Sequence, residues 1–206
     1  MEYLSKRVIK NYKIEFFDLV EDLRKDLGDN WEFHHYLVGS ARRNMVLDSN
    51  EGFDLDFHLM LTKWPAELSD EEIKKEIMKS IDNVKPDHLS NSKDSTHVIT
   101  LKCVQDDKLV YSYDIAIIHK EIKSQILKNE KQNDSNGPYH FVDIPDSSAF
   151  FVKYRMIRGP QMWQDLRDIY KTKKEEQHLV KKEDRIYSFA LLQSATNEVL
   201  QKYGME

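Results

Sequence analysis

Two aspartates separated by one residue stand in a run of alternating apolar and polar residues. The run is Phe53-Asp54-Leu55-Asp56-Phe57, and its alternation is typical of a β-strand with one wet face. Residues two apart on a strand project to the same side, so we expect the carboxylates of Asp54 and Asp56 to lie side by side. Magnesium is commonly held by one or two carboxylates together with substrate phosphates, so this pair predicts a divalent-metal site.

A third acidic residue, Asp114, interrupts the otherwise uncharged segment Val110–Ile118, which also has strand character. An unpaired buried carboxylate costs roughly several kcal/mol, a large part of a total stability of about 5–15 kcal/mol. The charge of Asp114 is therefore expected to be compensated. If its strand lies beside that of Asp54 and Asp56, two metal ions would neutralise the three carboxylates and hold the attacking and leaving oxygens of a displacement.

Gly39-Ser40 follows a short apolar strand expected at Tyr36–Val38. Glycine lets the backbone approach a ligand closely, and exposed amides with a hydroxyl bind phosphate oxygens. A plain turn with Ser40 as a helix N-cap has the same sequence, so the dipeptide alone is weak evidence for a phosphate site. An Asp-x-Asp pair alone is likewise more often an ordinary solvated surface.

Taken together, these elements resemble the DNA polymerase beta-like nucleotidyltransferases. Members of that family have an apolar strand ending in Gly-Ser or Gly-Gly, a spacer, an apolar-flanked Asp-x-Asp pair, and a third acid on a later strand. This chain has, in the same order, Leu37-Val38-Gly39-Ser40, a spacer from Ala41 to Phe53, Asp54-Leu55-Asp56 and Tyr113-Asp114-Ile115. The resemblance covers Tyr36 to Ile118.

The resemblance implies a role for each matching residue. Catalysis and the binding of magnesium or manganese are assigned to Asp54, Asp56 and Asp114, and Asp114 is placed near the acceptor hydroxyl. Binding of the nucleoside triphosphate is assigned to Gly39, Ser40 and Arg43. Many relatives carry an Arg-Gly-Thr-like segment after the Gly-Ser turn, whereas this chain has Arg43-Asn44-Met45, which leaves open the roles of the arginines at 42 and 43.

The reaction that this resemblance implies is transfer of a nucleoside monophosphate from a nucleoside triphosphate to a hydroxyl acceptor, with release of pyrophosphate. The acceptor is a small molecule, a protein or a nucleotide. One alternative is a synthase of oligonucleotide signals, in which the acceptor is a second nucleotide. Another is a non-catalytic nucleotide-binding or antitoxin-like regulatory module on the same fold.

Several elements must position these residues. Apolar residues recur at helical spacing from Val8 to Leu27, and a capping box formed by Ser69 and Glu72 predicts a helix over Asp70–Asn83. Two strands, His97–Val104 and Leu109–Ile118, are expected to form a hairpin. This order predicts an α+β fold, a mixed β-sheet flanked by helices, with a helical C-terminal segment.

The polar, breaker-rich segment Asn129–Pro138 is expected to be a mobile loop or a boundary. Beyond it, helical spacing predicts helices over Ser148–Ile157, Met162–Lys174 and Glu183–Tyr203, the last with Ile186 and Phe189 among its buried positions. We therefore expect a nucleotidyltransferase core over residues 1–128 and a helical segment over residues 139–206 that packs on it.

Composition limits the other functional classes. The chain has 206 residues, 40% hydrophobic and 33% charged, which indicates a compact globular protein. Cys103 is the single cysteine, and there is neither a signal-like apolar run near Met1 nor a membrane-length one, so a cytoplasmic protein without a membrane partner is expected. A net charge of -5 does not indicate a nucleic-acid partner, although a local basic groove stays possible.

Overall fold

The computed structural model describes residues 1–49, 51–120, 125–129 and 138–205. These residues form two compact units, one made of Glu2–Ile144 and the other of Met1 and Pro145–Glu206. The first unit contains the sheets, and the second contains helices only. Most of the predicted loop, residues 130–137, lies outside the described residues.

Helix α1 (Lys6–Leu27) and helix α3 (Asp70–Val84) are the two long helices of the first unit. The side chain of Ser5 accepts a hydrogen bond from the backbone N–H of Val8 and so begins α1. The predicted capping box is present at α3, because the side chain of Ser69 accepts from the N–H of Glu72 and the side chain of Glu72 accepts from the N–H of Ser69. Both predicted helices are confirmed.

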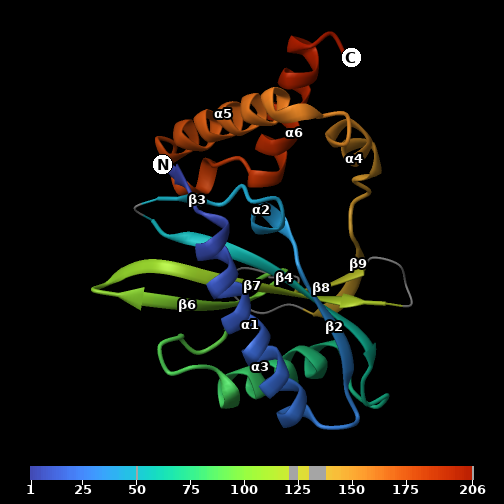
Figure 1. Ribbon diagram of the computed structural model, residues 1–206. Helices are drawn as coiled ribbons and strands as arrows, with labels where there is room; N and C mark the ends of the chain where they lie inside the picture. The colour runs from blue at the N-terminus through green and yellow to red at the C-terminus, as the bar shows by residue number, and fades with distance from the viewer. Residues whose placement is uncertain (50, 121–124, 130–137, 206) are drawn as a thin grey trace. The chain divides into compact units, whose positions relative to one another are not determined.

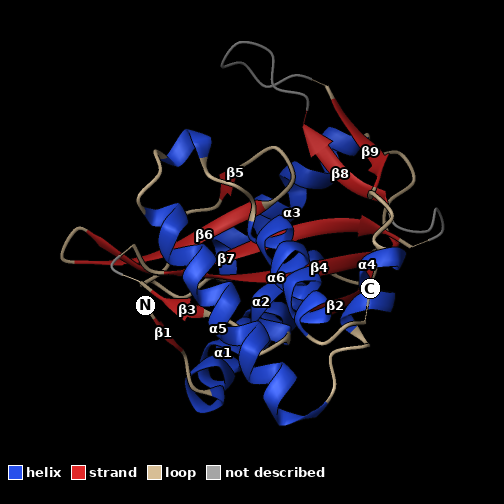
Figure 2. Ribbon diagram, turned by 90° about the horizontal axis from the view of Figure 1, so that it is seen from above, coloured by secondary structure: helices blue, strands red, loops and turns tan. Residues whose placement is uncertain are grey.

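The main sheet has a mixed topology, as predicted, and Figure 2 shows its strands side by side. Strand β4 is parallel to β7, and the other neighbouring strands are antiparallel. The strands in spatial order are β2 (Glu32–Leu37), β4 (Phe53–Lys63), β7 (Lys108–His119), β6 (Ile99–Gln105) and β5 (Lys93–Asp94).

Strands β8 (Gln125–Asn129) and β9 (Tyr139–Asp143) extend the sheet beyond the end of β7, and β1 (Glu2–Tyr3) pairs with β3 (Leu47–Asp48). The sequence did not predict these strands or β5. The strands β1, β3 and β5 have two residues each and so show no alternation that could reveal them.

Helices α1 and α3 cover one face of the sheet (Figure 1). The ring of Phe16 on α1 stacks on that of Phe57 on β4, with centroids 3.5 Å apart. The hydroxyl of Tyr113 on β7 donates to the carbonyl oxygen of Tyr12 on α1 over 2.8 Å. Because side chains alternate along a strand, the residues between these core positions project from the opposite face.

The second unit consists of α4 (Ser148–Tyr154), α5 (Gly159–His178), a 3-10 turn and α6 (Ser188–Lys202). The three predicted helices are present, but α6 begins later than expected. Ile186 precedes it and Phe189 lies in its first turn, with exposed fractions of 54% and 41%, so the prediction that they are buried was wrong. Helical spacing was extended across the irregular residues before Ser188, where Ile186 has no helical face, and the first turn of α6 leaves Phe189 exposed. No helix in the described ranges is long and apolar enough to cross a membrane.

Candidate active site

The three aspartates predicted to act together lie on two adjacent parallel strands. In the pairing of β4 with β7, Asp56 is opposite Asp114 and Asp54 is opposite Ser112. Paired residues of neighbouring strands project to the same face, and so do residues two apart on one strand. All three carboxylates therefore project from the sheet face opposite to α1 and α3.

Hydroxyl groups compensate two of these carboxylates. Oγ1 of Thr100 on β6 donates to Oδ1 of Asp114 over 2.6 Å, and Oγ of Ser112 donates to Oδ1 of Asp54. Burial raises the pKa of the Asp114 carboxyl above its ordinary value, the hydrogen bond from Thr100 opposes this shift, and the negative charge of Asp54 adds to it. The negative charge of Asp114 is thus compensated in part by the hydrogen bond from Thr100, as the sequence led us to expect.

Neither hydroxyl donor was predicted from the sequence. Ser112 had a signal, because it lies two residues before Asp114 and so shares its face. Thr100 had none, since its place beside Asp114 follows from the antiparallel register of β6 and β7.

Gly39 lies directly against the carboxylate of Asp56. Its φ is 60°, and a β-carbon built on it would lie 2.8 Å from Cγ of Asp56, so a larger residue would displace that side chain. The backbone N–H of Val38 also donates to the carbonyl oxygen of Asp56 over 2.9 Å. The glycine turn is thereby fixed beside the acidic strand.

Ser40 and Arg43 belong to the short helix α2 (Gly39–Arg42) and its end. Nη1 of Arg43 donates to the carbonyl oxygen of Gly39 over 2.6 Å, a bond that closes the turn. The N-cap of α2 is Val38, so Ser40 does not have the N-cap role that its sequence allowed. Phosphate binding by Gly39, Ser40 and Arg43 stays a prediction.

The set of donors matches magnesium, because hard cations prefer carboxylate oxygens and three carboxylates share this face. Across the ranges that the structure describes, no three Asp, Glu, His or Cys side chains form a group ready to hold a metal ion. The hydroxyl bonds of Ser112 and Thr100 occupy an oxygen of Asp54 and of Asp114 in this arrangement. Metal binding by these residues stays a prediction.

Similarity to solved structures extends over nearly the whole chain. The E. coli MS115-1 CdnC structure with ATP is 16% identical, with a TM-score of 0.58, covering 99% of this chain and 63% of that one. The GTP-bound form of Vibrio cholerae DncV is 12% identical, with a TM-score of 0.55, covering 95% of this chain and 57% of that one. This chain has the fold of the polymerase beta-like nucleotidyltransferases.

A third structure, the Elizabethkingia meningoseptica CdnE cyclic dinucleotide synthase with GTP and Apcpp, is 12% identical, with a TM-score of 0.55, covering 94% of this chain and 75% of that one. The chain therefore spans about six-tenths of the length of CdnC and DncV and three-quarters of CdnE. No protein-family model and no curated protein matches the sequence.

Proposed function

We propose that this protein transfers a nucleoside monophosphate from a nucleoside triphosphate to a hydroxyl acceptor and releases pyrophosphate. One observation carries the proposal: Asp54, Asp56 and Asp114 project from one face of two paired strands, with the Gly39 turn packed against Asp56. If the Asp-x-Asp pair were an ordinary solvated surface, there would be no reason for a third carboxylate on β7 or for a glycine packed against Asp56.

The Gly39-Ser40 turn is the donor side of this proposed site. The missing side chain at Gly39 lets the backbone of the turn pack against Asp56, and the bond from Arg43 to the Gly39 carbonyl keeps the turn closed. Amides and a hydroxyl held in this way bind phosphate oxygens. A divalent cation held by the three aspartates would neutralise phosphate charge and polarise the reacting phosphoryl group.

In the proposed reaction, the acceptor hydroxyl oxygen forms a bond to the α-phosphorus while the bond from that phosphorus to the α,β-bridging oxygen breaks. Pyrophosphate leaves with the electron pair, and the hydroxyl proton passes to Asp114. The protein supplies position and charge complementarity, which dominate catalysis of phosphoryl transfer.

Incubation with α-labelled ATP, magnesium and a panel of hydroxyl acceptors tests the proposal. Asp54→Asn and Asp56→Asn should each lower transfer by at least about a hundredfold, the scale of losing one preorganised electrostatic contact. Asp18→Asn removes an exposed carboxylate from α1, on the other side of the sheet, and should leave the rate unchanged. Equal rates in all three variants would defeat the proposal.

A second candidate is transfer to another nucleotide, which would link two nucleotides. It is favoured by the likeness to CdnE, whose structure is described as a cyclic dinucleotide synthase, and to DncV, described as a cyclic AMP-GMP synthase. Incubation with ATP and GTP alone separates the two candidates, because linked nucleotides without any added acceptor are expected only if the acceptor is itself a nucleotide. A regulatory module would instead bind ATP and release no pyrophosphate.

A further inference from the structure

Two exposed lysines project from the sheet face that carries the three aspartates. Lys93 on β5 pairs with Thr100 on β6, and Thr100 pairs with Asp114 on β7. Directly paired residues of neighbouring strands share a face. Lys93, Thr100 and Asp114 therefore form one row across three strands.

The second lysine lies in the adjoining row. Lys102 on β6 pairs with Ser112 on β7, and Ser112 pairs with Asp54 on β4. The charge of Lys102 acts on the site, because it opposes the rise in the pKa of Asp114. The rows of Lys93 and Lys102 thus place two ammonium groups at the same edge of the acidic patch.

The neighbour of Lys93 shows independently which way its strand faces. Asp94 forms an ion pair over 2.5 Å with Lys74, which is buried on α3 against the covered face. Since successive side chains of a strand point to opposite faces, Lys93 points to the site face.

The order of the strands separates the lysines from the glycine turn. Gly39 contacts Asp56 on β4, whereas β6 and β5 lie on the far side of β7. The aspartates therefore lie between the turn that is proposed to bind the triphosphate and the two lysines. In an in-line displacement the acceptor approaches the phosphorus opposite the leaving group, so the lysine side is the acceptor side.

Neither ammonium is engaged in a hydrogen bond or ion pair with any residue in the described part of the chain. Lysine is a mobile cationic donor that binds phosphate oxygens through charge-assisted hydrogen bonds. Two such groups beside three carboxylates would favour an anionic acceptor over a neutral one.

We propose that Lys93 and Lys102 bind a phosphate group of the acceptor, so that the protein selects a phosphorylated hydroxyl compound over its unphosphorylated form. This inference rests on the proposed nucleotidyl transfer. It adds two specificity-determining residues that neither contact the donor nor belong to the carboxylate set.

Calorimetric titration tests the proposal without turnover. The full chain, saturated with magnesium and a non-hydrolysable ATP analogue, is titrated with AMP and with adenosine, which carries the same ribose 2′- and 3′-hydroxyls. AMP should bind about tenfold more tightly, a factor typical of partly screened charge-assisted bonds. The variant K93Q/K102Q should bind AMP no better than adenosine, and K93R/K102R should keep the preference for AMP.

A matched control removes the same charge elsewhere. K10Q/K79Q changes two exposed lysines on α1 and α3, which cover the other sheet face, and should retain the AMP preference. A 5′-phosphorylated trinucleotide separates two kinds of phosphorylated acceptor. Tighter binding of the trinucleotide than of AMP would support the proposal and identify a nucleic-acid end as the acceptor. Equal binding would support the proposal and identify a free nucleotide as the acceptor.

Two outcomes would overturn the proposal, and they differ in their consequence for the proposed nucleotidyl transfer. If wild type binds the ATP analogue but binds AMP and adenosine equally, or if K93Q/K102Q keeps the AMP preference, the lysines do not select the acceptor and the proposed transfer is unaffected. If wild type does not bind the ATP analogue at all, the proposed function fails and this inference fails with it.

Discussion

The α-carbon of Gly39 lies so close to the Asp56 carboxylate that a β-carbon on residue 39 would lie 2.8 Å from Cγ of Asp56. The φ of 60° at Gly39 also disfavours any other residue. Gly39→Ala should therefore displace Asp56, lower the rate of pyrophosphate release at least about a hundredfold, and lower the free energy of unfolding by about 1–3 kcal/mol. Rates and chemical denaturation measure the two effects.

Gly28→Ala is the matched control for that substitution. Gly28 also has a positive φ, 75°, but no atom lies within 4 Å of a β-carbon placed there. It should lose about 1 kcal/mol of stability through backbone strain and keep full activity. Equal losses of activity at the two glycines would contradict the assigned role of Gly39.

How much of this site was predictable depends on the kind of information each part needs. The alternation Phe53-Asp54-Leu55-Asp56-Phe57 determines which side chains are buried, because the apolar members must face a core. The capping box at Ser69 is local in the same way, and both predictions were confirmed. Short-range patterns therefore placed the acids on a strand and gave them one face.

Long-range pairing was not predictable in the same way. Asp114 reaches Asp56 because β7 pairs in parallel with β4, across a connection that contains α3, β5 and β6. Only the family resemblance indicated that the third acid joins the first two. Lys93 was missed because β5 has two residues and no alternation, and the partnership of Thr100 with Asp114 follows from register alone.

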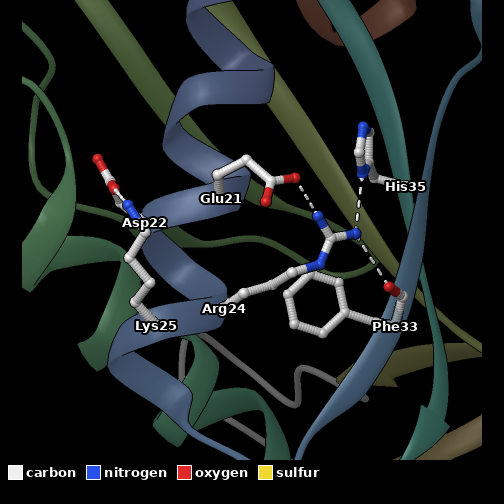
Figure 3. Close-up of polar contacts among 6 residues, drawn as sticks. All are labelled: Glu21, Asp22, Arg24, Lys25, Phe33 and His35. Carbon is white, nitrogen blue, oxygen red and sulfur yellow. Dashed lines mark hydrogen bonds and ion pairs between the residues drawn. The ribbon is translucent and has the colours of Figure 1, made fainter.

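His35 should make stability depend on pH. Nη2 of Arg24 lies 3.3 Å from Nδ1 of His35 and donates to the carbonyl oxygen of Phe33, while Nη1 contacts Glu21 (Figure 3). Because arginine can only donate, Nδ1 of His35 must accept, which requires the neutral ring. Burial, and then the charge of Arg24, lower the pKa of His35 below its ordinary value.

A lowered histidine pKa means that the folded state resists protonation more than the unfolded chain does. Its contribution to stability is therefore present above the unfolded pKa near ~6.5 and is lost as the pH falls through the folded pKa. Chemical denaturation between about pH 8 and pH 5 should show this loss, and His35→Gln should reduce it. His34→Gln, at an exposed neighbouring position, should leave the wild-type slope, and an unchanged slope in His35→Gln would contradict the argument.

Lys74 should be essential to the stability of the sheet edge. Its side chain is 2% exposed, and its ammonium pairs with Asp94 on β5 over 2.5 Å and donates to the carbonyl oxygen of Ser95 over 2.9 Å. Lys74→Met leaves Asp94 without its buried counter-charge and should lower the free energy of unfolding by about 3–5 kcal/mol. Lys75→Met, which breaks an exposed pair with Glu71 on the same helix, should cost less than about 1 kcal/mol.

Glu15 joins α1 to the covered face of β7. Its Oε1 accepts a hydrogen bond from the hydroxyl of Tyr111 over 2.6 Å, and it shares the single proton of the Tyr113 hydroxyl with the carbonyl oxygen of Tyr12, each over 2.8 Å. Glu15→Ala removes the carboxylate acceptor of the buried Tyr111 hydroxyl but leaves Tyr113 the Tyr12 carbonyl, so it should lower the free energy of unfolding by about 1–3 kcal/mol, which urea denaturation measures. Glu15→Gln keeps a carbonyl acceptor and should recover part of the loss.

The exposed acid Asp18 lies on the same helix, and Asp18→Ala should change stability by less than about 0.5 kcal/mol. Because Tyr113 directly precedes Asp114, Glu15→Ala should also lower the rate of transfer if the anchored strand holds that carboxylate in place. If Glu15→Ala were as stable as Asp18→Ala, the tyrosine hydroxyls would not depend on Glu15.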